Sequence, residues 1–323
     1  MWKGICLKDP ELRSLAGDIP GILLRDRAPR TVRKYQDSFQ RWHTWAESKD
    51  LCSLPATGQE IALYVAFLLR TARTMSTIHS AVYAIAWAHK KAGKKSPTEH
   101  TLVKQMIEAS RRIVGLKPVN RKQPLEAKHV KAIIVKFGDG NLGQLQIATL
   151  ITLGFSAFLR WDDLSKLERQ DIAMENDHMK IFLVKRKNDQ YREGSWILVA
   201  RSGKISCPVK LLEKFLRMGK HSQQDKLFRK ISHTSNGMQL RKSPLSYSRA
   251  LELFKMQISS IGLNPSAYGL HSLRSGGTSE AAAWGIPDRL IQRHGGWRSE
   301  KSMNMYIKET HNTLLRVSQS LGL

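Results

Sequence analysis

The chain has few acidic residues for its size. It contains 27 Asp and Glu against 53 Lys and Arg, which gives a formal net charge of +26. Such an excess of cations favours a polyanionic partner, because a bound polyanion releases its condensed counterions. A ribosomal-type protein or a membrane-surface binder can carry the same charge. Composition therefore indicates nucleic-acid binding without identifying the nucleic acid.

Cysteine and long apolar runs are also scarce. Cys6, Cys52 and Cys207 are widely separated and form neither a C-x-x-C pair nor a metal-ligand spacing, which argues against a zinc module or a disulfide scaffold. The longest apolar stretch, 61–69, is too short to span a bilayer. Since no signal peptide is recognisable, we expect a soluble intracellular protein with no membrane partner.

Helical periodicity divides the chain into two domains, a number that 323 residues allow. Residues 1–25 carry weak signals and are expected to form an N-terminal arm. Gly115, just before it, and Pro118, within it, indicate a linker over 117–124. Apolar residues at intervals of three and four predict a helical domain over 26–116, with helices near 31–45, 59–69, 78–89 and 99–114.

The second domain, 125–323, mixes helices and strands. Met179, Ile181 and Leu183 recur at a period near two, so 179–184 and 195–199 are expected to pair around a turn at 188–189. Helices are expected near 126–137, 142–158, 209–218, 246–261, 272–284, 287–294 and 301–307. The predicted fold class is mostly α with a small antiparallel β-sheet.

Basic residues are concentrated in the second half of the helical domain and in the linker. Residues 70–122 contain twelve Lys and Arg but only two acidic residues, whereas a balanced solvated face would carry both signs. Part of this stretch is therefore expected to contact phosphates, although a solvated helical face remains the alternative. The segment 90–95 also resembles a nuclear-import signal of low specificity. The candidate DNA-binding residues are Arg33, Lys34, Arg73, Lys90, Lys91, Lys94, Lys95, Arg111, Arg112, Arg121 and Lys122.

The most informative pattern lies near the C-terminus. His271 and Arg274 form an H-x-x-R box, and Trp297 precedes Tyr306 by nine residues. An arginine can clamp the non-bridging oxygens of a phosphodiester in a planar fork, and a phenol can attack the phosphorus to form a covalent intermediate. In a chain of this charge, the expected phosphodiester is DNA.

Three further side chains complete the chemistry. Arg160, at the end of an apolar helix, can supply a second guanidinium for the transition state, and Asp163 can orient a neighbour, with Asp162 as an alternative carboxylate. Lys187, at the expected hairpin tip, can protonate the departing oxygen. Lys185 lies two residues away and is an alternative, because the hairpin register is not fixed by sequence.

These residues resemble the pattern of the tyrosine recombinases of the phage-integrase family: Arg, Asp or Glu, Lys, H-x-x-R, His or Trp, and Tyr. Every element is present here in order, and Gly295-Gly296-Trp297 matches the family's Gly-Gly-Trp form. The resemblance covers about 27–320, and the C-terminal third resembles the phage Cre recombinase. His294 is a rival to Trp297, but its separation of twelve residues from Tyr306 departs from the pattern.

The resemblance implies a helical core-binding, SAM-like domain and a mixed α+β catalytic domain that clamp duplex DNA. Tyr306 would leave a 3′-phosphotyrosine and a free 5′-hydroxyl, His271 would transfer a proton, and Trp297 would donate to a phosphate oxygen as the family's histidine does. No metal, ATP or other cofactor is implied. A homotetramer on two DNA sites would exchange strands through a Holliday junction.

Several alternatives remain at this level. Each site residue has a plain structural interpretation, such as packing for Tyr306. Leu314, Val317 and Leu321 form a stripe that either packs on its own domain or docks into a neighbouring protomer. The chain could also be a domesticated DNA-binding protein that no longer cuts, or a type IB topoisomerase-like enzyme. The expected location is with DNA, in the nucleus of a eukaryote or the nucleoid of a bacterium, and the target sequence is not readable from the chain.

Overall fold

The computed structural model describes residues 8–71, 74–115, 121–184, 194–235, 237–309 and 311–322. The chain divides into two compact units, a helical unit up to Asn120 and a mixed unit from Arg121. This division falls inside the stretch that the sequence indicates as a linker. None of the described helices is both long enough and apolar enough to cross a membrane.

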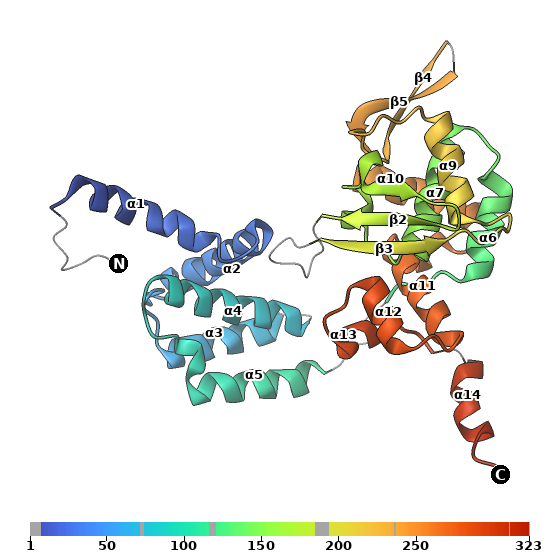
Figure 1. Cartoon of the computed structure of the whole chain (residues 1–323). Helices are drawn as coiled ribbons and strands as arrows, with labels where there is room; N and C mark the ends of the chain where they lie inside the picture. The colour runs from blue at the N-terminus through green and yellow to red at the C-terminus, as the bar shows by residue number, and fades with distance from the viewer. Residues whose placement is uncertain are drawn as a thin grey trace. The chain divides into compact units, whose positions relative to one another are not determined.

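The helical unit packs α2 to α5 around one small core, and α1 precedes them in the chain (Figure 1). Trp42, Ile61, Ile78 and Ile85 are fully buried in this core, since apolar residues at intervals of three and four place one face of each helix inward. The helices are α1 (Pro10–Leu24), α2 (Pro29–Glu47), α3 (Gly58–Thr71), α4 (Met75–Lys91) and α5 (Thr101–Val114), with a short 3-10 turn, η1 (Pro97–Glu99), before α5.

Helix α1 is a correction to the sequence prediction, which expected only an arm over 1–25. The Asp9 side chain caps the helix by accepting the Leu12 N–H at 3.0 Å. Gly17, Pro20 and Gly21 all lower helix propensity, which is why the sequence signal was weak.

The mixed unit is organised around α7 (Leu142–Ser156), which is buried almost along its whole length. Helices α6, α9, α10 and α11 pack against it. The helices of this unit are α6 (Ala127–Phe137), α8 (Trp161–Leu164), α9 (Pro208–Met218), α10 (Tyr247–Ser260), α11 (His271–Ala283), α12 (Asp288–Gly295), α13 (Glu300–Asn304) and α14 (His311–Gln319), with 3-10 turns η2 (Arg169–Asp171) and η3 (Pro265–Ala267).

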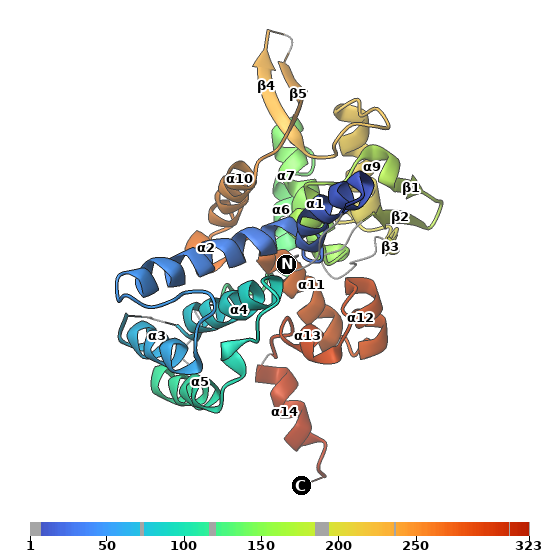
Figure 2. The same cartoon turned by 90° about the vertical axis from the view of Figure 1, so that its left-hand side faces the viewer.

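The strands form two separate antiparallel sheets. The order of the first is β1 (Ile172–Met174), β2 (His178–Leu183) and β3 (Ser195–Ala200), and Ile181 pairs with Ile197. The second is the hairpin of β4 (Arg229–Thr234) and β5 (Gly237–Pro244). Figures 1 and 2 show this hairpin at one end of the mixed unit and α14 projecting from the other.

The predicted class, mostly α with a small antiparallel sheet, is confirmed, and so is the pairing of 179–184 with 195–199. Strand β1 and the hairpin β4–β5 were not predicted. Helix α13 ends at Asn304 instead of continuing to 307, so Tyr306 lies in a turn beyond the helix. The tyrosine therefore belongs to the segment between α13 and α14.

Candidate active site

Four of the predicted site residues surround one point in the mixed unit; we call them the tyrosine cluster: His271, Arg274, Trp297 and Tyr306. The Tyr306 ring centroid lies 5.1 Å from that of His271 and 5.2 Å from that of Trp297. The guanidinium carbon of Arg274 lies 5.0 Å from the Tyr306 ring centroid. The phenol therefore has a cation, an imidazole and an indole as immediate neighbours.

Arg274 is held rigidly, with only 2% of its surface exposed. Its Nη1 donates to the carbonyl oxygen of Phe158, and its Nη2 donates to that of Gly295 at 2.9 Å. The guanidinium carbon also stacks 3.9 Å from the Trp297 ring centroid, a cation–π arrangement. These contacts orient the planar fork, because each fixes a different edge or face of it.

The segment before Arg160 adopts an uncommon backbone conformation. Phe158 has a φ of +49°, a left-handed geometry that costs a bulky residue about 1–2 kcal/mol. Its ring packs at 4.6 Å edge-on to His294 and at 6.3 Å from Trp297, and its carbonyl receives Arg274. Packing and a charged hydrogen bond thus offset the strain and hold the turn that presents Arg160.

Asp163 fixes the start of α8 and, with it, Arg160. Its Oδ2 accepts the backbone N–H of Arg160 at 2.9 Å, and Asp163 is buried. The alternative carboxylate, Asp162, pairs with Lys166 at 2.6 Å on the exposed side. Arg160 Nη1 is buried and has no hydrogen-bond partner in the described part of the chain, so it is available to an oxygen ligand.

Trp297 is positioned by its neighbours in sequence. Gln292 binds its backbone twice: the Gln292 carbonyl accepts the Trp297 N–H at 3.0 Å, and Gln292 Nε2 donates to the Trp297 carbonyl at 3.1 Å. Gly296 ends α12 in the left-handed region, with φ +66°. The indole Nε1 is buried without a hydrogen-bond partner among the described residues, and an unsatisfied buried donor of this kind costs about 1–3 kcal/mol unless an acceptor is supplied.

Two glycines let α11 pack directly on the backbone of neighbouring segments. A Cβ at Gly276 would lie 2.0 Å from the Leu125 carbonyl oxygen, and one at Gly277 would lie 2.1 Å from that of Phe155. Only glycine permits this approach, which carries Arg274 close enough to reach Phe158.

Replacing Gly295 by Ala is expected to disturb the site, because the added Cβ would lie 1.7 Å from Cζ3 of Trp297. Overpacking of this kind costs roughly 1–3 kcal/mol, and the indole must move. Thermal unfolding is expected to shift downward by several degrees. Gly269→Ala is the matched control, since its Cβ would meet only Lys122 Cγ at 3.7 Å. Equal melting temperatures for the two variants would contradict the packing argument.

Two other predictions concern Lys187 and His294. Lys187 and its alternative Lys185 lie outside the described residues, so the general acid remains a prediction. His294 Nε2 donates to the Ser156 carbonyl oxygen at 2.9 Å, and its ring supports Phe158. His294 therefore stabilises the backbone segment from Ser156 to Phe158, next to the site.

The candidate DNA-binding residues fall into three groups. Lys91 is engaged internally, paired with Asp26 at 2.9 Å, and Arg111 pairs with Glu108 at 3.0 Å. Arg112 is 3.9 Å from Glu108, and Lys122 Nζ donates to the Ser266 carbonyl. Arg73 lies outside the described residues. The exposed remainder is Arg33, Lys34, Lys90, Lys94, Lys95 and Arg121.

A groove of about 410 Å³ in the helical unit was not anticipated from sequence. It is lined by Lys34, Arg41, Tyr64 and five Ser or Thr side chains. Burial raises the pKa of Tyr64, and the positive charge of Arg41 opposes this shift. Cations and hydroxyls together suit phosphate oxygens. The five hydroxyl side chains are Ser38, Thr74, Ser76, Thr77 and Ser80. Four of them cluster at and near the start of α4, and this recurrence of Ser and Thr is the sequence signal for the groove.

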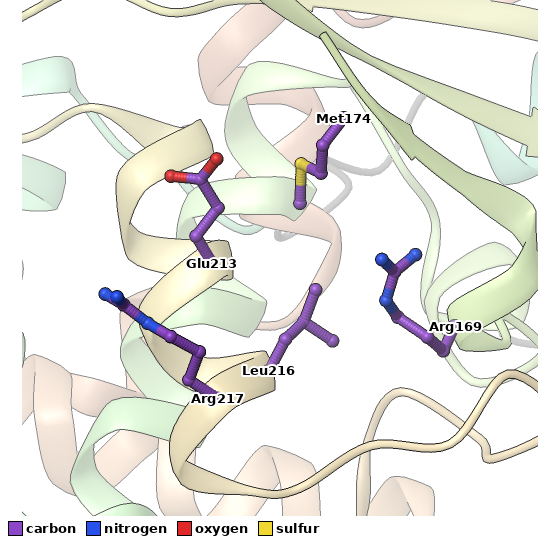
Figure 3. A pocket seen from close by; sticks show the side chains of 5 residues that line it. All are labelled: Arg169, Met174, Glu213, Leu216 and Arg217. Carbon is purple, nitrogen blue, oxygen red and sulfur yellow. The ribbon is translucent and has the colours of Figure 1, made fainter.

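A second cavity, of about 520 Å³, lies in the mixed unit (Figure 3). Two of its three charged side chains are already engaged: Glu213 binds Arg201 at 2.6 Å, and Arg169 donates to the Ile172 carbonyl at 2.7 Å. No residue of the tyrosine cluster lines it. In the ranges that the structure describes, no group of three or more His, Cys, Asp or Glu side chains is placed to hold a metal ion.

A mostly helical fold that brings a tyrosine next to arginine, histidine and tryptophan is characteristic of enzymes that transfer DNA strands. The model of the phage integrase family matches residues 123–313, more than half of the chain. The protein therefore belongs to the phage integrase family, the tyrosine recombinases, which cut and rejoin DNA.

Individual proteins are similar to this chain in sequence or in fold. The chain is 26% identical over 291 residues to the integrase/recombinase xerD homolog of Selenomonas ruminantium, covering 89% of this chain and 84% of the relative. Its fold is similar to that of the XerH recombinase bound to difH (TM-score 0.64, 16% identity, 93% and 81% of the two chains). It is also similar to the Tn1549 transposon integrase with transposon right-end DNA (TM-score 0.60, 12% identity, 95% of this chain and 99% of the other). A third similar structure is a lambda integrase dimer on a COC′ core site (TM-score 0.57, 16% identity, 93% of this chain and 96% of the other).

Proposed function

We propose that Tyr306 is the nucleophile of a site-specific DNA recombinase and that Arg274 and Arg160 bind the phosphate that it attacks. The observation that carries the proposal is the contact of the Tyr306 ring with Arg274, at 5.0 Å, and with His271, at 5.1 Å. A guanidinium beside the phenol neutralises the charge that grows on the phosphate oxygens. The buried N–H groups of Arg160 and Trp297 would donate to the same oxygens.

The reaction is a transesterification. The Tyr306 phenol loses its proton, the phenolic oxygen bonds to phosphorus, and the bond from phosphorus to the 5′ oxygen breaks. The departing oxygen takes up a proton, from Lys187 if the sequence prediction holds, and His271 transfers protons on the nucleophile side. The products are a 3′-phosphotyrosine and a 5′-hydroxyl. Attack by a 5′-hydroxyl from a second duplex reverses these steps and joins new strands.

A nicked suicide duplex and a pair of full sites together separate the three candidate functions. A nicked suicide duplex loses its 5′-hydroxyl fragment after cleavage, so a covalent adduct accumulates. We expect an adduct with this protein and junctions when two full sites are supplied. Failure to form an adduct on the right site would indicate a domesticated DNA-binding protein, and adducts without junctions would indicate a topoisomerase-like enzyme. The compact length of the chain and the H-x-x-R form of His271 and Arg274 favour recombination over DNA relaxation.

We infer that the groove lined by α2 and α4 in the helical unit binds the phosphate backbone of DNA. Replacing Lys34 by Ala removes one cation from this groove, so the slope of log affinity against log salt should become shallower by about 0.9. Lys91→Ala removes a cation that already pairs with Asp26 and serves as the control, with an unchanged slope. Binding titrations at several salt concentrations give both slopes; equal slopes would show that DNA does not contact the groove.

We infer also that α14 joins protomers into the tetramer that acts on two sites. Leu314, Val317 and Leu321 are 59%, 70% and 65% exposed, which does not fit packing on their own unit. Deletion of 311–323 should leave suicide-substrate cleavage intact and weaken assembly, as measured by light scattering on DNA-bound protein. Unchanged assembly and recombination after the deletion would disprove the docking role. The protein would act wherever its DNA substrate resides.

A further inference from the structure

Tyr306 lies in a turn, and one side chain ties this turn to the body of the mixed unit. The hydroxyl of Ser279 donates to the Tyr306 carbonyl oxygen at 3.2 Å and accepts the backbone N–H of Lys308 at 2.9 Å. Since α13 ends at Asn304, these two backbone groups have no regular helical ladder to join. A single hydroxyl therefore satisfies backbone groups on both sides of Ile307.

The position of Ser279 along α11 gives this tie its significance. His271 is the first residue of the same helix, and Arg274 lies one turn later. The proposed proton-transfer group, the proposed phosphate ligand and Ser279 therefore all lie on one helix. The helix itself is locked in place, because Gly276 and Gly277 pack directly on backbone oxygens of neighbouring segments. Any movement of the turn relative to Arg274 must break the Ser279 contacts.

The packing beneath the turn does not replace these hydrogen bonds. Tyr306 and Ile307 are only partly buried against the small apolar cluster that contains Trp297 and Met303. Contacts of this kind are non-directional, so they keep the ring near the cluster without fixing the position of the phenolic oxygen relative to Arg274. Directional hydrogen bonds to the backbone supply that restriction.

We propose that Ser279 is a positioning residue: its hydroxyl holds the nucleophile turn in register with Arg274, so that the phenol reaches the phosphate gripped by its own chain. The inference rests on the proposed function of Tyr306. The role needs a group that donates and accepts at once on a short stem, which a serine or threonine hydroxyl does and an alanine methyl does not. A misplacement of about 1 Å at a reacting atom lowers a rate by up to about 10²-fold.

The test is single-turnover cleavage of the nicked suicide duplex by the full-length protein over a range of protein concentrations. Ser279→Ala is expected to lower the maximal rate by about 10- to 100-fold while the half-saturating concentration and the melting temperature stay within error of wild type. Ser279→Thr, which keeps the hydroxyl, should recover most of the rate. The matched control is Ser275→Ala, one turn earlier on α11, whose hydroxyl bonds among the described residues only to carbonyls of its own helix, at 3.3 and 3.4 Å.

Hydrogen exchange provides a readout that does not depend on catalysis. The Lys308 amide should exchange slowly in wild type and in Ser279→Thr, and faster in Ser279→Ala. A wild-type rate for Ser279→Ala, or a rate loss accompanied by weaker binding and a lower melting temperature, would overturn the positioning role. If wild-type protein forms no adduct through Tyr306, the proposed function fails on its own, while the exchange of Lys308 still reports whether the tie exists.

Discussion

Replacing Tyr306 by Phe is expected to eliminate the covalent adduct and to leave DNA binding and folding unchanged. The phenylalanine ring keeps the contacts with His271 and Trp297, at 5.1 and 5.2 Å, but lacks the oxygen that attacks phosphorus. Removal of a nucleophile lowers rates by about 10⁴-fold or more, which takes adduct formation below detection on a denaturing gel. Melting temperature and DNA affinity are measured alongside.

The control for this substitution is Tyr247→Phe. Tyr247 lies on α10, is 52% exposed, and contacts the Trp161 ring edge-on at 6.1 Å, so loss of its hydroxyl should not change the rate. A full yield of adduct with Tyr306→Phe would show that a different side chain is the nucleophile. A rate loss in both variants would point to a general effect of removing phenols.

Replacing Arg274 by Lys is expected to lower the cleavage rate by about 10³-fold, although the charge is formally kept. A lysine ammonium cannot stack flat on Trp297 at 3.9 Å while it also donates to the carbonyls of Phe158 and Gly295. The phosphate would lose a planar, pre-oriented fork, and the Phe158 turn would lose its anchor. A moderate drop in melting temperature should accompany the rate loss.

A neutral substrate separates catalysis from folding in this variant. A methylphosphonate at the scissile position lacks one negative oxygen, so the penalty of Arg274→Lys should shrink if the guanidinium acts on charge. Arg217→Lys, on α9 beside the second cavity, which no residue of the tyrosine cluster lines, is the control and should cleave normally. An Arg274→Lys protein that cleaves within tenfold of wild type would contradict the clamp.

Sequence alone was sufficient for the parts of the site that depend on residue type and spacing. The H-x-x-R box placed His271 and Arg274 on one helix face, and the nine-residue step brought Trp297 next to Tyr306, as the 5.2 Å ring separation shows. Helical periodicity likewise located α3 to α6, because each buries one apolar face, whereas α7 is buried almost along its whole length.

The remainder depends on tertiary structure, which leaves no local pattern. The positive φ of Phe158 is imposed by packing on His294 and by its bond to Arg274. The end of α13 at Asn304 and the bonds of Ser279 could not be read either, because an isolated serine in a helix has no distinctive spacing. The hairpin β4–β5 was missed, since its exposed strands lack a strong alternating pattern.

The most direct measurement is to digest the adduct trapped on a suicide duplex and to locate the linkage by mass spectrometry, with the cleaved strand labelled at either end. We predict that a single peptide containing Tyr306 carries the nucleotide and that the 5′-labelled fragment remains attached to protein, as a 3′-phosphotyrosine requires. Attachment of the 3′-labelled fragment, or of DNA to a residue other than Tyr306, would contradict the central claim that this phenol attacks a phosphate held by Arg274 and Arg160.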